Sequence, residues 1–313
     1  MDTDNLNKKI ISTLSYFSIF DYPLTAFEIW KFLFSEKNCA THSLNQIENV
    51  MNSLILQNSI SKKHGFYSIK NKLNIEELVE KRMHRHRIAQ HKYKKALFII
   101  KIISYLPSIK MVGVCNSLSY NNAHKKSDID LFIITKKNHI WLARFIIVGI
   151  LKLLKMRPTT KNTSDKICAS FFASEDNLDF KKIQINHSMK IVDIYLIYWI
   201  ATLVPIYSSG DAYNKFINKN LWIKKHLLQW QPYITNNERV ITTNPIVKLF
   251  CNIFYIIPEK LAKKIQLAIM PIRLREMANK DSKVIINDSI LKFHDKDRRE
   301  EYYHKWEDIK SKL

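Results

Sequence analysis

The beginning of the chain combines short amphipathic helical patterns with polar breaks. Apolar residues recur at helical spacing from Leu6 to Phe20, and the pattern stops at Asp21-Tyr22-Pro23. Thr25 is placed to cap a second helix, and Ser43 is placed to cap a third. We therefore expect three short helices before residue 56.

The next segment has the pattern of a β-hairpin. Residues Ser59–Ile69 alternate and turn at His64-Gly65. The resulting order of three helices and a hairpin is that of a winged helix. Residues 5–70 also resemble winged-helix domains in the entry Tyr22-Pro23-Leu24-Thr25 and in the basic hairpin Lys62-Lys63-His64-Gly65. The resemblance implies that the third helix contacts DNA.

That third helix is not basic, because its polar positions are Asn45, Gln46, Glu48, Asn49 and Asn52. A module of the same shape that contacts another protein, or the rest of this chain, is therefore the alternative to DNA binding.

A long amphipathic helix is expected from Asn74 to about Tyr105, ending before Pro107. Its first half contains the basic run Lys81–Arg87. This run predicts either a surface that faces phosphates or a solvated helix face.

Two apolar strands carry the candidate chemistry. Ile109–Cys115 is the first, and Asp128–Thr135 is the second, after a polar turn that enters a short helix. Because side chains alternate along a strand, Asp128 and Asp130 share one face, and Ile129, Leu131 and Ile133 line the other. Two carboxylates on one face favour a divalent metal, and Mg²⁺ takes a few carboxylates together with substrate phosphates.

The residues Val112–Thr135 resemble the nucleotidyltransferase fold typified by DNA polymerase β, whose members carry Gly-Ser after one strand and Asp-x-Asp on the next. The matching residues here are Asn116-Ser117 and Asp128-Ile129-Asp130. The resemblance implies that Asp128 and Asp130 are catalytic and bind Mg²⁺, and that Asn116 and Ser117 bind a nucleoside triphosphate (NTP). It also implies transfer of a nucleoside monophosphate to a hydroxyl of a nucleic acid, a protein or a small molecule, with release of pyrophosphate.

The chain departs from this family pattern at two positions. Asn116 replaces the glycine that lets the backbone approach phosphate closely. Many members also use a third carboxylate on a later strand, whereas the run Ile167–Phe172 contains none. We nominate Glu175, which follows that run, as the third catalytic carboxylate.

The predicted fold class is α/β (α+β). We expect a winged-helix domain at residues 1–72 and a mixed-sheet, nucleotidyltransferase-like core with its leading long helix at 73–185. A helical C-terminal domain is expected at 186–313, because the apolar runs there have helical spacing. This combination is similar to a group of bacterial proteins.

The composition restricts the kinds of partner and the location that we expect for the protein. The net charge of +22 favours an anionic partner, although the excess of lysine and the presence of only 4 glycines also match the bias of an AT-rich genome. Four widely spaced cysteines predict free thiols in a reducing cytoplasm. Charged residues interrupt each long apolar run, so we expect buried helices and no membrane span.

The function expected first is a cytoplasmic, Mg²⁺-dependent nucleotidyltransferase. The main alternative is a non-catalytic regulator that senses nucleotide or binds DNA through the winged helix. A third is an antitoxin-like or otherwise paired protein whose core modifies a partner.

Overall fold

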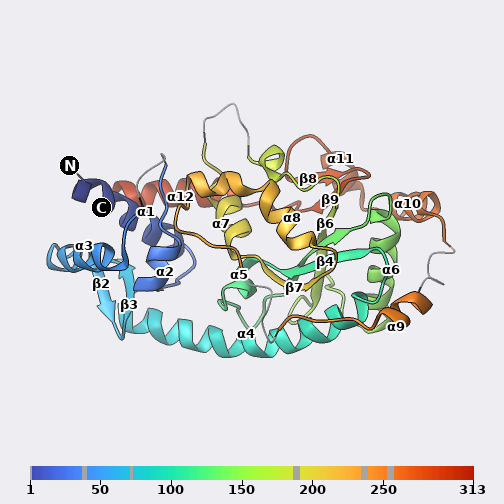
Figure 1. Ribbon diagram of the computed structural model, residues 1–313, viewed down its shortest axis with the longest axis horizontal. Coiled ribbons are helices and arrows are strands. Elements are labelled where there is room, and N and C mark those ends of the chain that lie inside the picture. Colours follow the sequence, from blue (N-terminus) through green and yellow to red (C-terminus); the bar gives the residue numbers. More distant parts are fainter. Residues whose placement is uncertain (1, 37–40, 71–72, 186–190, 234–238, 252–256) are drawn as a thin grey trace.

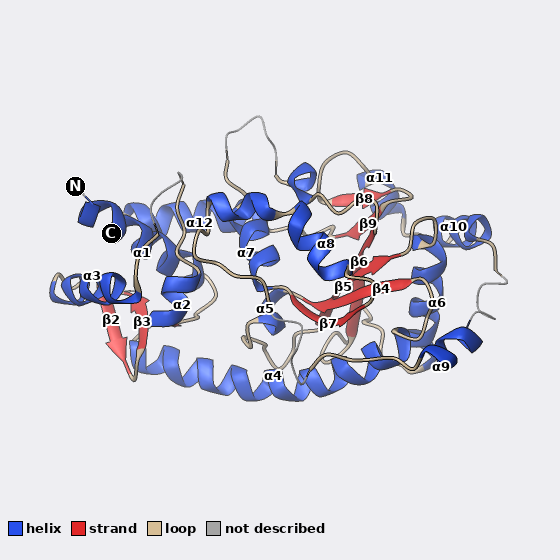
Figure 2. Ribbon diagram, in the orientation of Figure 1, coloured by secondary structure: helices blue, strands red, loops and turns tan. Residues whose placement is uncertain are grey.

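The protein is a mixed α/β structure, shown here as a computed structural model that describes residues 2–36, 41–70, 73–185, 191–233, 239–251 and 257–313 (Figure 1). Within these residues there are twelve α-helices, a three-stranded antiparallel sheet and a six-stranded mixed sheet. Figure 2 shows the two sheets in opposite halves of the molecule, with the long helix α4 (Ile75–Ile103) running past both.

The first 70 residues form what we call the N-terminal module. Its helices and strands are α1 (Asp2–Ser18), β1 (Leu24–Thr25), α2 (Ala26–Lys31), α3 (Leu44–Leu56), β2 (Ile60–Lys63) and β3 (Phe66–Ile69). The predicted order of three helices and a hairpin is therefore confirmed, and β1 adds a third strand beside β3.

Local side-chain chemistry explains these boundaries. Thr25 and Ser43 each accept a hydrogen bond from the backbone amide of the third helical residue, and the side chains of Glu28 and Gln46 accept one from the backbone amide of the cap residue. His64 and Gly65 have φ values of 49° and 78°, which a two-residue turn between strands of this twist requires.

The large sheet has the order β7-β4-β5-β6-β9-β8. Its strands are β4 (Ile109–Val114), β5 (Ile129–Thr135), β6 (Ile167–Ser174), β7 (Val204–Ser208), β8 (Val284–Ile286) and β9 (Ile290–Phe293). Strands β5 and β6 are parallel, and the other neighbours are antiparallel. The helix α6 (Ile140–Leu153) connects β5 to β6, as a parallel pair requires.

Helices cover both faces of this sheet. Buried residues of α4 and α6 pack with Ile129, Leu131 and Ile133 of β5 on one face. Buried residues of α7 (Ile194–Thr202) and α8 (Ala212–Lys219) pack with Phe132 and Ile134 of β5 on the other. The remaining helices are α5 (Asn116–Ser119), α9 (Pro245–Phe250), α10 (Glu259–Ala268), α11 (Ile272–Met277) and α12 (Arg299–Ser311).

The expected helical character of residues 186–313 needs correction, because three strands of the large sheet lie there. Strand β7 pairs with β4, and β9 pairs with β6. A boundary at residue 185 therefore divides one sheet. These strands are only three to five residues long, and β7 contains Pro205 at the sheet edge, where a missing backbone donor is tolerated.

Within the basic run Lys81–Arg87, Arg82 and Arg85 are turned toward the protein, whereas His84, His86 and Arg87 are exposed. Arg82 donates two hydrogen bonds of 2.8 Å to Glu28, and its guanidinium lies 4.1 Å from the centre of the Tyr22 ring. Arg85 is buried and donates to the carbonyl of Phe20 at 2.7 Å. These arginines fasten the N-terminal module to α4 instead of facing solvent.

The helix α12 returns to the N-terminal module. Its Trp306 is buried, and the indole Nε1 donates to the Ser12 carbonyl at 2.9 Å. Its Arg299 is buried as well, and donates to Asp193 at 2.8 Å and to Asp297 at 2.9 Å. In the part of the chain that the structure describes, no helix is both long enough and apolar enough to cross a membrane.

Candidate functional site

Three chain segments meet at one edge of the large sheet. Strand β4 ends there, and the antiparallel β5 begins beside it, so that the amide of Cys115 donates to the Asp130 carbonyl at 3.2 Å. Strand β6 begins at the same edge, because it is parallel to β5, with Cys168 paired to Asp130. Asn116 and Ser117, Asp128 and Asp130, and Cys168 therefore come from adjacent strand ends.

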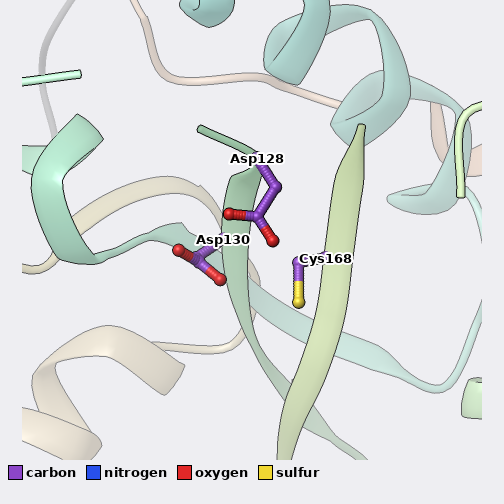
Figure 3. Close-up of side chains that lie close together, drawn as sticks. All are labelled: Asp128, Asp130 and Cys168. Carbon is purple, nitrogen blue, oxygen red and sulfur yellow. The ribbon is translucent and has the colours of Figure 1, made fainter. Parts of the chain in front are cut away.

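Two carboxylates and a thiol form the centre of this edge. One ligand atom each from Asp128, Asp130 and Cys168 lies within 4.8 Å of the other two, and all three side chains are partly buried. Figure 3 shows Asp128 and Asp130 on one strand and Cys168 on its neighbour, around a single small space. The predicted placement of both aspartates on one strand face is seen, with Ile129, Leu131 and Ile133 buried on the opposite face.

The two carboxyl groups are electrostatically strained. Burial and the charge of Asp128 raise the pKa of Asp130 to about 7, because both disfavour its ionised form. The pKa of Asp128 is raised as well, chiefly by burial. Burial and the two carboxylates hold the pKa of the Cys168 thiol well above its usual value. A cation at this place would relieve all three effects.

The turn after β4 has an unusual backbone conformation at Asn116. Asn116 has a φ of 57°, in the left-handed region that glycine adopts most easily and that asparagine tolerates better than other residues. Its Oδ1 accepts a hydrogen bond from the Tyr195 hydroxyl at 3.0 Å. The turn therefore has a left-handed residue at Asn116, and Ser117 follows it in the short helix α5.

A buried lysine fixes the loop that leads into Asp128. Lys92 of α4 is 1% exposed, and its ammonium donates to the Ser127 carbonyl and to Asp165, both at 2.6 Å. Lys95 binds the other oxygen of Asp165 at 2.7 Å. The start of β5 and the approach to β6 are thus tied to one rigid helix.

The site opens into a cleft between the sheet, the N-terminal module and α12. A hollow of about 440 Å³ is lined by Asn116 and Ser117, and a neighbouring hollow of about 280 Å³ is lined by Asp130 and Cys168. Both are lined by Asn116, Tyr195, Trp199, Arg298 and Tyr302. The rings of Tyr195 and Tyr302 stack with centres 5.3 Å apart, and Arg298 lies 5.0 Å from the centre of the Tyr302 ring.

The structure does not bring Glu175 to this site, which corrects its nomination as the third carboxylate. Glu175 follows the far end of β6, where its amide donates to the Thr135 carbonyl at 2.9 Å. Because Asp130 and Thr135 are five residues apart on β5, this position lies ~17 Å away along the sheet. Its carboxylate accepts a hydrogen bond from the Lys137 amide at 3.2 Å.

Three further side chains lie at this edge that the sequence pattern did not predict: Cys168, Ser170 and His294. Cys168 and Ser170 lie half-buried on one face at the start of β6, and the thiol donates to the Ser170 hydroxyl at 3.3 Å. His294, which follows β9, lies 3.2 Å from the same hydroxyl, and burial lowers its pKa to about 3. The apolar run at Ile140–Leu153 could have predicted these residues. A crossover helix between β5 and β6 makes the two strands parallel and places their first residues together.

The donor atoms of this group match the preferences of Mg²⁺ only in part. The carboxylates of Asp128 and Asp130 are oxygen ligands of the kind that Mg²⁺ prefers, and they leave room for waters and phosphate. The thiol of Cys168 is a soft ligand that Mg²⁺ does not select.

Comparisons of the chain with protein-family models, with curated proteins and with solved structures find no significant match. The chemistry of this edge therefore has to be inferred from its own side chains.

Proposed function

We propose that the protein binds an NTP and a divalent cation at the Asp128–Asp130 edge and transfers a nucleoside monophosphate to a hydroxyl acceptor. The observation that carries this proposal is the pair of strained carboxylates Asp128 and Asp130, with Asp130 lining the same hollow as Asn116. Such strain is maintained against the stability of the fold, which is typical of functional sites.

The surrounding fold supports the same proposal. The order α4-β4-α5-β5-α6-β6 places a turn after one strand and two carboxylates at the start of the next, as in the nucleotidyltransferase fold that the sequence resembles. The N-terminal module, with its three helices and hairpin, supports the finer assignment of a winged helix. The core that follows this module is assigned, in the same proposal, to a nucleotidyltransferase-like fold.

The residues of the site would have separate tasks. Asp128 and Asp130 would hold a cation such as Mg²⁺, which supplies charge neutralisation to the triphosphate. Asn116 and Ser117 would present backbone amides and a hydroxyl to phosphate oxygens. The acceptor oxygen forms the new bond to the α-phosphorus, the bond to the bridging oxygen breaks, pyrophosphate leaves, and the acceptor proton passes to solvent. Stacked Tyr195 and Tyr302 would give a base a flat surface.

Binding and transfer of an α-labelled NTP test the proposal. We expect calorimetry to show NTP binding that requires a divalent cation, and we expect Asp128→Asn and Asp130→Asn to abolish both binding and transfer. Glu175→Gln is the matched control, because it removes a carboxylate at the other end of β6 and should leave both unchanged. Absence of NTP binding with every divalent cation would refute the proposal.

A second candidate is a protein that binds nucleotide without turnover. It is favoured by the position beside Asp130 on β6, where a thiol stands and no carboxylate does. For this candidate, labelled NTP would bind with metal but no product would form with any acceptor class.

The DNA-binding form of this candidate has weaker support. The exposed side chains of α3 include Asn45, Glu48, Asn49 and Asn52, and α3 has no basic residue, whereas Lys62 and Lys63 lie on the hairpin. Of these, Lys63 is paired with Glu76 at 3.1 Å. Salt-sensitive DNA binding that survives both aspartate substitutions would establish this function.

A further inference from the structure

The position of Cys168 is hard to reconcile with a site for Mg²⁺ alone. Its paired neighbour across the parallel strands is Asp130, and its sulfur lies within 4.8 Å of ligand oxygens of both aspartates. Its sulfur donates to the Ser170 hydroxyl at 3.3 Å, a weak bond for a thiol donor, and it also makes hydrogen bonds with the carboxyl groups of Asp128 and Asp130. The thiol is therefore aimed at the place where the cation would sit.

A small adjustment would make the three donors a coordination set. Ligands on Zn²⁺ lie at ~2.0–2.2 Å for carboxylate oxygen and ~2.3 Å for sulfur, so tetrahedral neighbours are ~3.3–3.6 Å apart. The present separations, at most 4.8 Å, exceed this range by no more than ~1.2–1.5 Å, which small side-chain rotations can close. Three protein ligands leave a fourth position for water or a substrate oxygen, which is the arrangement of catalytic zinc sites.

Donor chemistry then decides among cations. A thiolate with two carboxylates is a mixed set that suits Zn²⁺ or Co²⁺, whereas Mg²⁺ takes oxygen ligands almost exclusively. Ionisation of the thiol releases its proton to solvent as the metal–sulfur bond forms, and no electron is transferred.

We propose that the cation at this edge is bound by Asp128, Asp130 and the thiolate of Cys168, and that it is a thiophilic divalent ion of the Zn²⁺ class. This inference rests on the metal site of the proposed function and specifies which ion occupies it. The ion would retain one open position toward the cleft that Asn116 and Ser117 line.

Cobalt spectroscopy on the purified full chain tests the ligand set without reference to activity. With Co²⁺ added to metal-free protein, we expect the near-ultraviolet charge-transfer band of a cobalt–thiolate bond. Cys168→Ser should abolish this band and weaken Zn²⁺ binding by at least ~100-fold, since loss of an outer-shell partner alone costs ~10–100-fold. Retention of the band in Cys168→Ser, or its absence in the native chain, would overturn the inference.

Cys115→Ser is the matched control. Cys115 flanks Asp130 from β4, but its sulfur faces the Asp130 carbonyl at 3.5 Å and is outside the three-residue group. The band and the Zn²⁺ affinity should survive this substitution. Cys251→Ser, in a thiol remote in sequence from the site, serves if the first control does not fold.

A Cys168→Asp variant separates this inference from the proposed function. Its oxygen-only set should lose the cobalt–thiolate band and bind Mg²⁺ more tightly than the native chain does. If the native band is present but no NTP binds with any cation, the proposed function fails and the ligand set stands. If NTP binds with Mg²⁺ equally well in the native chain and in Cys168→Ser, and neither shows the band, the ligand set fails and the proposed function stands.

Discussion

Replacement of Asp130 by asparagine should stabilise the metal-free protein at alkaline pH. Burial and the neighbouring Asp128 raise the Asp130 pKa from 3.8 to about 7. A folded-state pKa above the unfolded value means that the native state binds more protons between these two pH values. The contribution of the Asp130 carboxyl to the free energy of unfolding is therefore fully present below pH ~4, and it is lost as pH rises to ~7.

The magnitude follows from the shift. Each pKa unit corresponds to ~1.4 kcal/mol, so an isolated group with this shift would cost ~4 kcal/mol above pH 7. Because Asp128 shares the repulsion and Asp130→Asn gives up some hydrogen bonding, we expect a net gain of ~2–4 kcal/mol at pH 8. The chain of 313 residues has an unfolding entropy of ~0.66 kcal/mol/K, so the melting temperature should rise by ~3–6 °C.

Thermal unfolding of the native chain and Asp130→Asn, with chelator present, measures this gain at pH 5 and pH 8. The difference between the two proteins should be ~2–3 kcal/mol smaller at pH 5 than at pH 8, because at pH 5 the carboxyl is ionised in the unfolded chain but still protonated in the native state. Asp176→Asn is a control of opposite sign, because hydrogen bonds from Ser174 and Lys137 lower the pKa of Asp176. Equal melting temperatures of the native chain and Asp130→Asn at pH 8 would show that the carboxyl groups are not strained.

Three further substitutions test other parts of the structure. Arg299→Met leaves the buried carboxylate of Asp193 without its ion-pair partner, while Asp297 keeps Lys292, and should lower the free energy of unfolding in urea by ~3–5 kcal/mol; a loss below ~1 kcal/mol would contradict the role of the Arg299–Asp193 pair. Lys92→Met frees the loop before Asp128 and should weaken Mn²⁺ binding ~10-fold or more, whereas Lys95→Met, at the exposed partner of the same carboxylate, should weaken it less. Gly113→Ala places a Cβ 2.9 Å from a leucine side chain and should cost ~1–3 kcal/mol in chemical denaturation, whereas Gly149→Ala, with nothing within 4 Å, should stabilise its helix.

The sequence predicted the elements that depend on local chemistry. Thr25 and Ser43 identified two helix starts through their side-chain caps, and His64-Gly65 identified the hairpin turn. The alternation around Asp128 and Asp130 identified both the strand and the face that carries the carboxylates. In each case, the relevant interaction spans only a few residues.

The parts that depend on long-range pairing were harder to predict. Glu175 was chosen because it follows an apolar run, but the direction of β6 relative to β5 decides which end of that run meets Asp130. Strand β7 was not expected, because five residues with a proline at the sheet edge carry little strand signal. Pairing partners are set by tertiary packing, which local patterns do not encode.

The burial of Trp306 against α1 has a consequence for how the protein is made. The tryptophan reaches the Ser12 carbonyl, so the first and last helices complete one another's packing. During synthesis α1 emerges long before α12, so the contact between them can form only after the roughly 280 residues that separate them have been made. We therefore expect fragments of the N-terminal module that lack α12 to expose apolar surface and aggregate, and ribosome-bound chains to need protection until α12 has emerged.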